Sequence, residues 1–315
     1  RQRPCTCSST WWKRPRVPEP YATPGAVEAA IKEAARKAAK ADPALDVNRR
    51  IQLEYFNRFL SRVFAEGSAW LLKGGAGMLA RLPSCRATQD IDLAGRGFTL
   101  TQGLNELTRL AASDLDDHFG FEYVGHRESI RVDSQPYLEG FEVRFNVRIG
   151  GASKGQLKVD LVMEAGVTGE VTTTRPANAL DLPRLTSNPY RLYPVVDQVA
   201  DKVCATMTDY GRRSSSREKD LVDLVVVATT QEVGGTALRL AITTEARRRR
   251  MKPFSRFVVP STWGSGYARL SRSVPYCADH RTVDLATNLV THFSDPALCG
   301  DADRMTWSPG SLTWV

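Results

Sequence analysis

Residues 71–93 have the sequence LLKGGAGMLARLPSCRATQDIDL, and the fold of the chain follows from them. A short apolar strand is expected to end at Lys73, and the two glycines after it allow the backbone to approach phosphate oxygens closely. A helix of small residues over 77–82 and a second short strand carrying Asp90 and Asp92 are expected next. The segment therefore predicts a strand, a glycine turn, a helix and an acidic strand.

The two acids of this strand predict a metal site. Asp90 and Asp92 are two residues apart, so on a strand their side chains share one face. Adjacent carboxylates repel each other unless a cation lies between them. Mg²⁺ takes few protein carboxylates and leaves room for phosphate oxygens. Asp160 lies on a later strand, on the face opposite its apolar residues, and is expected to be a third carboxylate. The predicted ligands of Mg²⁺ (or Mn²⁺) are Asp90, Asp92 and Asp160.

The hydrophobic period changes twice along the chain. Helical spacing is evident over 24–41 and 47–66, period-two alternation over 141–149 and 156–163, and helical spacing again from 194. The expected fold class is α+β, with a mixed β-sheet core flanked by helices. The expected parts are an extended basic, proline-rich arm (1–22), a core with N-terminal helices (23–193) and a mainly helical C-terminal domain (194–315).

The composition indicates a globular chain with a polyanionic partner. Of its 315 residues 42% are hydrophobic, and the net charge is +8 at pH 7. A basic balance of this kind favours nucleic acid as a partner. Apolar runs stay far below the roughly 20 residues of a membrane span, so no membrane contact is expected. The cysteines lack zinc-site spacing and are expected to be reduced thiols of a cytoplasmic protein, which we expect to be a monomer.

Basic side chains are clustered at two places in the C-terminal half. Such clusters bind nucleic-acid backbones by releasing counterions, although each could equally be a solvated helix face. The candidate RNA-binding residues are Arg212, Arg213, Arg247, Arg248, Arg249 and Arg250.

Four motifs together resemble a known family. They are Leu72–Gly75, Arg86–Leu93, Asp201-Lys202 and Lys219–Leu224. A glycine turn followed by D-x-D and a third acid is similar to the DNA polymerase beta nucleotidyltransferase superfamily, although the gap from Gly75 is slightly longer than usual. Within that superfamily the motifs resemble the AbiE-type (AbiEii) nucleotidyltransferase toxins of type IV toxin–antitoxin systems, with a mycobacterial branch. The resemblance covers roughly residues 45–230.

The resemblance implies a nucleotidyltransferase-like fold and a role for each matching residue. Binding of the NTP is implied for Lys73, Gly74, Gly75 and Lys202. Catalytic acids are implied at Asp90, Asp92 and Asp223. Supporting roles are implied for Arg86, Thr88, Asp160 and Asp220.

The activity implied is metal-dependent transfer of nucleotides from an NTP to an RNA acceptor, expected to be the tRNA 3′ end, which blocks translation. A cognate antitoxin protein is the implied partner. Two alternatives stay open: an inactive nucleic-acid-binding module of the same fold, and transfer of a nucleotide monophosphate to a protein. Retention of Lys73, Lys202 and the acids in one chain argues against the first, and labelling of protein rather than RNA would favour the second.

Thr88 adds a regulatory hypothesis. It lies two residues before Asp90, so a phosphate on it would place negative charge beside the predicted metal ligands. An antitoxin that causes this modification would silence the enzyme. The alternative is that Thr88 simply buttresses the start of the strand.

Overall fold

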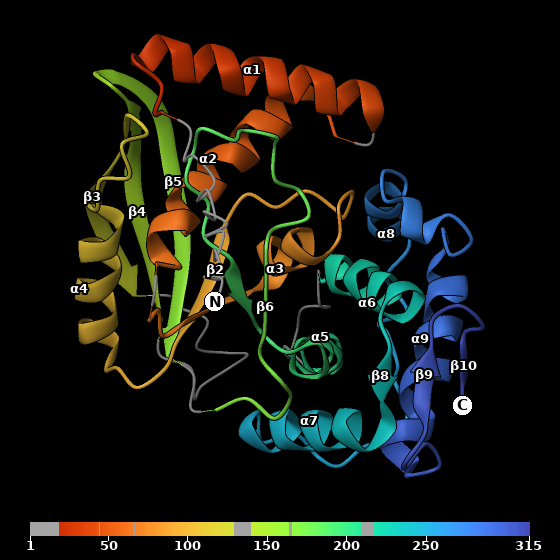
Figure 1. Cartoon of the computed structure of the whole chain (residues 1–315). Coiled ribbons are helices and arrows are strands. Elements are labelled where there is room, and N and C mark those ends of the chain that lie inside the picture. Colours follow the sequence, from red (N-terminus) through yellow and green to blue (C-terminus); the bar gives the residue numbers. More distant parts are fainter. Residues whose placement is uncertain (1–18, 44, 66, 129–139, 164–165, 209–216) are drawn as a thin grey trace, which may run out of the picture.

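The structure is a computed structural model that describes residues 19–43, 45–65, 67–128, 140–163, 166–208 and 217–315 (Figure 1). Its main strands are β1 (Trp70–Lys73), β2 (Ile91–Gly95), β3 (Phe119–Glu128), β4 (Gly140–Ile149), β5 (Ala152–Met163), β6 (Thr172–Thr174) and β7 (Tyr190–Leu192). They form one sheet in the order β3-β4-β5-β2-β1-β7-β6. Because β2 pairs antiparallel with β1 and parallel with β5, the sheet is mixed, and the α+β prediction is confirmed.

The helices cover the sheet and extend beyond one edge of it. They are α1 (Pro24–Ala41), α2 (Val47–Val63), α3 (Gly74–Arg81), α4 (Leu100–Ala111), α5 (Val195–Met207), α6 (Glu218–Thr230), α7 (Gly235–Arg248), α8 (Ser265–Ser271) and α9 (Val283–Cys299). The ring of Phe59 on α2 packs 5.3 Å from Phe121 and 5.1 Å from Phe145, between ring centroids. The apolar face of β3–β4–β5 is therefore the face that α2 covers.

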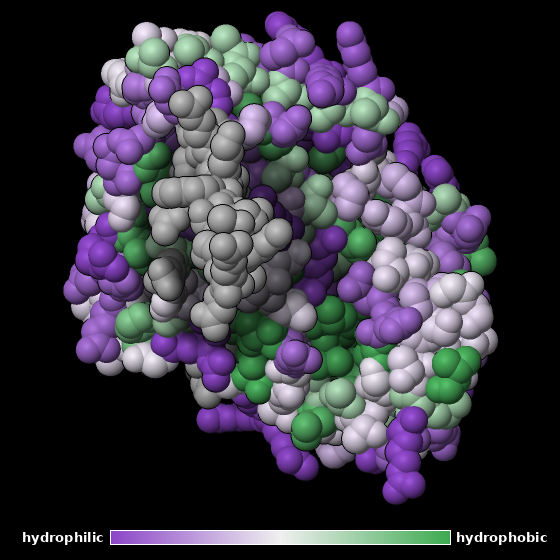
Figure 2. Space-filling model, viewed as in Figure 1, coloured by the Kyte–Doolittle hydropathy of each residue, from purple (hydrophilic) through white to green (hydrophobic). Residues whose placement is uncertain are grey.

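The first helix lies on the outside of the molecule. α1 packs along α2 through Val27, Ile31 and Ala35. Its exposed residues include Lys32, Arg36, Lys37 and Lys40 among alanines, and this edge of the molecule is a mixture of hydrophilic and hydrophobic residues (Figure 2). In the parts of the chain that the structure describes, no helix combines the length and apolar character that a membrane crossing requires.

Two element boundaries in the decisive segment differ from the prediction. α3 starts at Gly74, earlier than the predicted 77, because a positive φ of 58° at this glycine turns the chain directly from β1 into the helix. β2 starts at Ile91, so Asp90 lies just before the strand rather than on it.

The C-terminal part is mainly helical and also contains a small sheet. Strands β8 (Val233–Gly234), β9 (Thr306–Ser308) and β10 (Thr313–Trp314) pair in the order β10-β9-β8. The indole of Trp307 is fully buried and donates a hydrogen bond to the carbonyl of Ala228, 2.7 Å away. Residues 253–315, which include α9, thus pack against α6 and form part of the core. A domain boundary at 194 stays a prediction, and most of the predicted arm, 1–18, lies outside the described residues.

Candidate functional site

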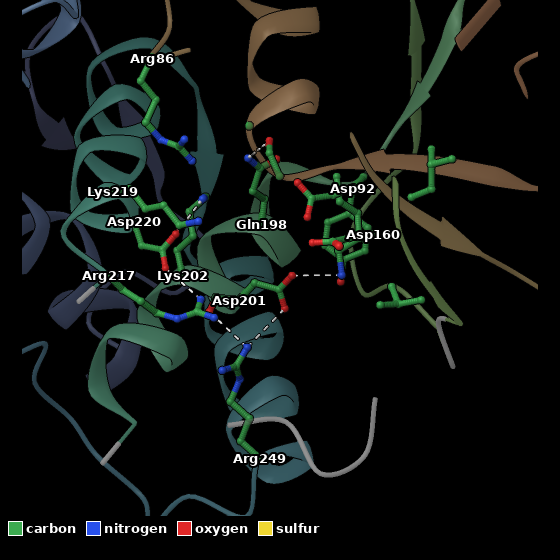
Figure 3. Close-up of a pocket in the computed structure, with 16 residues that line it drawn as sticks. Arg86, Asp92, Asp160, Gln198, Asp201, Lys202, Arg217, Lys219, Asp220 and Arg249 are labelled. Atoms are coloured by element: carbon green, nitrogen blue, oxygen red, sulfur yellow. Dashed lines mark hydrogen bonds and ion pairs between the residues drawn. The ribbon is translucent and has the colours of Figure 1, made fainter. Parts of the chain in front are cut away.

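A cavity of about 200 Å³ lies between the sheet and helices α5 and α6 (Figure 3). The cavity is lined by residues from the N-terminal and C-terminal halves of the chain. Its charged, amide and glycine residues are Lys73, Gly74, Gly75, Arg86, Asp92, Asp160, Gln198, Asp201, Lys202, Arg217, Lys219, Asp220 and Arg249. The structure thus brings most of the residues selected from the sequence to one place. The acids of the sheet lie on one side of the cavity and most of the cations on the other (Figure 3).

Asp92 and Asp160 form the acidic side. They are direct neighbours in the parallel pairing of β2 and β5 and point into the cavity together. Gly74 allows this placement, because a Cβ built on it would lie 2.0 Å from Oδ2 of Asp92. Two carboxylates on adjacent strands suit Mg²⁺, which binds through one or two protein carboxylates plus phosphate oxygens.

Asp90 is not one of the residues lining this cavity. Within the described ranges, no three or more side chains of His, Cys, Asp or Glu come close enough together to hold a metal ion. The donor set that fits a divalent ion is therefore the pair Asp92 and Asp160. A ligand role for Asp90 stays a prediction.

Lys73 sits at the end of β1, beside the acidic pair. Its ammonium lies 3.1 Å from Oδ2 of Asp201 and 4.1 Å above the ring centroid of Tyr193. Burial alone would raise the pKa of Asp201, but Lys73 and Arg249 outweigh this effect and lower it. Lys73 is 9% exposed, so a carboxylate partner stabilises its charge at the cavity wall.

Lys202 is held between two acids of α6. Its Nζ lies 2.5 Å from Oδ2 of Asp223 and 3.3 Å from Oδ1 of Asp220. Burial alone would lower the pKa of Lys202, but Asp223 and Asp220 raise it above its ordinary value. Asp220 also accepts a hydrogen bond from Arg217 at 3.1 Å. Lys202 is therefore a fixed cation of the cavity, and Asp220 is one of its supports.

Asp223 has a different position from the metal-side acids. It is 1% exposed and does not line the cavity. Arg86 donates two hydrogen bonds to its carboxylate, at 2.8 and 2.7 Å, and Lys202 donates a third. Burial alone would raise the pKa of Asp223, but Lys202 and Arg86 lower it. Its geometry is that of a residue that positions Arg86 and Lys202.

The arginine run at the C-terminal end of α7 is only partly a surface feature. Arg249, predicted as an RNA contact, is buried: its Nε lies 2.6 Å from Glu245 and its Nη2 lies 4.0 Å from Asp201. The helix ends at Arg248 and the side chain of Arg249 lines the cavity, so an RNA contact of Arg249 stays a prediction. Arg248 donates to the carbonyl of Gly166 at 2.8 Å. Arg247 and Arg250 are exposed, whereas Arg212 and Arg213 lie outside the described residues.

Thr88 lies deep in the loop before β2. It is 8% exposed, and its hydroxyl donates to the carbonyl of Asp90 at 3.1 Å. Its side chain fills the space next to Gly75, where an added Cβ would lie 2.9 Å from the Cβ of Thr88. This position agrees with the alternative in which Thr88 supports the start of the strand. A kinase could reach the hydroxyl only if the loop opened. Regulation through Thr88 stays a prediction.

The sequence interpretation missed several lining residues, and two of them, Gln198 and Asp201, lie on α5. Gln198, Asp201 and Lys202 are spaced three and four apart on α5 and share one helical face. Gln198 donates to the carbonyl of Gly74 at 3.3 Å, so this face also holds the glycine turn. Helical spacing from Lys202 could have found both partners.

Comparison with known proteins gives one family and several similar structures. The family described as "Nucleotidyl transferase AbiEii toxin, Type IV TA system" matches residues 58–288. No curated protein matches the chain. The solved structure of MenT4, a nucleotidyltransferase toxin from Mycobacterium tuberculosis, is 16% identical with a TM-score of 0.46, over 86% of this chain and 98% of that chain. JHP933 from Helicobacter pylori is 15% identical with a TM-score of 0.35, over 65% and 73%.

Proposed function

The chain belongs to the AbiEii nucleotidyltransferase toxins of type IV toxin–antitoxin systems, and we propose that it transfers nucleotides from an NTP to the 3′ end of a tRNA. The observation that carries the proposal is one cavity that has Asp92 and Asp160 on its sheet side, with Lys73 on the neighbouring strand, and Lys202, Arg217 and Lys219 on the side of α5 and α6. A triphosphate needs both: acids that hold a metal at the reacting phosphate, and cations for the phosphates that leave.

Asp92 and Asp160 would hold Mg²⁺ or Mn²⁺, with Asp90 as a further candidate. The metal, when bound, supplies positive charge at the reacting phosphate and favours the deprotonated form of the attacking hydroxyl. Gly74 keeps the carboxylate of Asp92 in place, because any larger residue would collide with it.

The protein's own cations position the nucleotide. Lys73 and Lys202 would bind the β- and γ-phosphates as point charges, and Arg217 and Lys219 line the same cavity. The acceptor hydroxyl oxygen bonds to the α-phosphorus, and its proton passes to solvent. The bond from the α-phosphorus to the bridging oxygen breaks, and pyrophosphate leaves with the electron pair. Fixed charges stabilise this leaving group without reorganisation.

The biological consequences belong to the same proposal. Nucleotides added to the tRNA 3′ end would prevent aminoacylation and so block translation, and a cognate antitoxin would relieve the block. Transfer to a protein is the second candidate, since the cavity chemistry is the same and only the acceptor differs. An inactive binding module is disfavoured, because Lys73, Lys202 and the acids of the sheet are gathered around one cavity.

The test is a transfer assay with two positions of label. The protein is incubated with total tRNA, Mg²⁺ and each NTP in turn, labelled on either the α- or the γ-phosphate. We expect α-label in the RNA with one or more NTPs, γ-label only in pyrophosphate, and loss of both with EDTA or with Asp92→Asn. Label in the protein fraction would support the second candidate. RNA binding without any label would support the inactive module.

A further inference from the structure

The cavity's acidic pair continues onto an exposed polar face of the sheet. In the antiparallel pairing of β4 and β5, Glu142 lies opposite Asp160 and Arg144 lies opposite Lys158. Residues two apart on a strand share a face and lie roughly 7 Å apart. Lys158 is therefore on the same face as Asp160, one step further from the cavity.

Among the described residues, this face is exposed along β5 and partly exposed along β4. α2 packs on the opposite, apolar face through Phe59, whose ring contacts Phe121 and Phe145. Lys158 and Gln156, along β5, are exposed. The polar face thus runs outward from the cavity as an accessible strip.

Lys158 is the cation of this strip whose charge is available. The carboxylate of Glu142 forms ion pairs with both neighbouring arginines: Oε1 lies 2.8 Å from Nη2 of Arg144, and Oε2 lies 2.5 Å from Nη2 of Arg127. Among the described residues Lys158 has no ion-pair partner. An exposed, unpaired lysine beside a metal-binding acid is suited to bind an anion that approaches the cavity.

The direction of the reaction places the acceptor on this side. The sheet order β4-β5-β2-β1 puts the acidic pair between Lys73 on β1 and the strip on β4 and β5. In-line transfer requires the attacking oxygen and the leaving group on opposite sides of the α-phosphorus. If pyrophosphate leaves toward Lys73 and the cations of α5 and α6, the attacking hydroxyl arrives over β5 and β4.

We propose that the acceptor RNA lies along the exposed face of β4 and β5, and that Lys158 binds a backbone phosphate close to the reacting 3′ hydroxyl. The inference rests on the proposed function and names the acceptor surface of the same site. It differs from the surface around Arg247 and Arg250, which lies at the C-terminal end of α7.

The test compares charge reversals at three exposed side chains of the full chain. Lys158→Glu should raise the KM for tRNA about tenfold and leave the KM for the NTP unchanged. A tenfold change corresponds to the free energy of about one hydrogen bond to a charged group. Lys37→Glu, at an exposed lysine of α1, is the matched control and should change neither. Arg247→Glu tests the competing surface. Lys158→Gln should lower the slope of log binding constant against log salt by about 0.7–1.

Each outcome decides between the surfaces. An unchanged KM for tRNA in Lys158→Glu, or an equal rise of the KM for the NTP, would overturn the inference, as would an effect confined to Arg247→Glu. Label that appears in protein instead of RNA would also overturn it. If the wild-type protein labels nothing, the proposed function fails. RNA binding with an unchanged salt slope in Lys158→Gln would refute the surface even then.

Discussion

Asp223→Asn should destabilise the protein strongly, because it removes the counter-charge of two buried cations. The carboxylate accepts hydrogen bonds at 2.8 and 2.7 Å from Arg86 and at 2.5 Å from Lys202. An amide keeps one oxygen and turns an N–H toward these donors. Removing one partner of a buried ion pair costs about 3–5 kcal/mol. We expect this loss in the free energy of unfolding at pH 7, measured by urea denaturation with tryptophan fluorescence.

The pH dependence of the loss follows from the pKa of Asp223. Burial alone would raise this pKa, but Lys202 and Arg86 hold it below its ordinary value. A depressed folded-state pKa contributes stability that is complete above the unfolded value of about 3.9 and is lost as the pH falls through the folded value. The gap between the wild type and Asp223→Asn should therefore be constant from pH 5 to 8 and shrink in more acidic solution.

The matched control is the same substitution in an exposed ion pair. Asp303 lies 2.7 Å from Arg239, and the two side chains are 36% and 40% exposed. Asp303→Asn should cost at most about 1 kcal/mol. If Asp223→Asn costs no more than Asp303→Asn, Asp223 is not the buried support described above.

Three further changes test other parts of the account. Gly74→Ala should lower kcat about 100-fold, because the new Cβ displaces the carboxylate of Asp92 and a misplacement of about 1 Å at a reacting centre costs about that factor in rate. Its control is Gly67→Ala, because Gly67 also has a positive φ but has no atom within contact distance of the added Cβ. Asp201→Asn should raise the KM for the NTP about tenfold, because Lys73 loses the carboxylate that holds it in place. A tenfold change corresponds to the free energy of about one hydrogen bond to a charged group. Asp201→Glu, which keeps a carboxylate, should restore part of the affinity. Glu54→Gln should stabilise the protein relative to the wild type by about 3 kcal/mol more at pH 8 than at pH 4, because burial raises the pKa of Glu54 to about 7.

Glu54→Gln stabilises the protein more at high pH than at low pH because the pKa of Glu54 is raised in the folded state. The folded carboxyl stays protonated up to about pH 7, whereas the unfolded carboxyl ionises from about pH 4.3 upward. Its contribution to stability is thus lost as the pH rises between these values. Equal pH profiles for wild type and Glu54→Gln would contradict this. Equal kcat in Gly74→Ala and Gly67→Ala, or a lower KM for the NTP in Asp201→Asn, would contradict the other two.

The sheet and its acids were predictable because their signals are local. The alternation around Asp92 predicts a short strand with this acid on its polar face, and the period-two stretch around Asp160 predicts another strand, whereas Asp90 lies just before β2. The parallel pairing that brings Asp92 beside Asp160 is not encoded locally, and the sequence predicted only that Asp160 is a third carboxylate on a later strand. Strands of two or three residues, such as β8 and β10, are too short for any period to show.

The partners of buried charges were the least predictable part. A run of basic residues looks like a solvated surface, yet Arg249 turns inward because Glu245 lies one helical turn before it. Asp223 was predicted as a catalytic acid, a role that stays a prediction, and the sequence did not indicate that its carboxylate pairs with Arg86 and Lys202. Burial decides such cases, and burial depends on how α5, α6 and α7 pack together.

The mass of a tRNA before and after incubation tests the central claim most directly. Purified tRNA is incubated with the protein, Mg²⁺ and the active NTP, beside the same tRNA whose 3′ cis-diol has been destroyed by periodate. We predict a gain of one or more whole nucleotide units in the intact tRNA, and no gain in the oxidised tRNA or with Asp92→Asn. An equal gain in the oxidised tRNA, or a gain in the mass of the protein alone, would contradict transfer to the 3′ end.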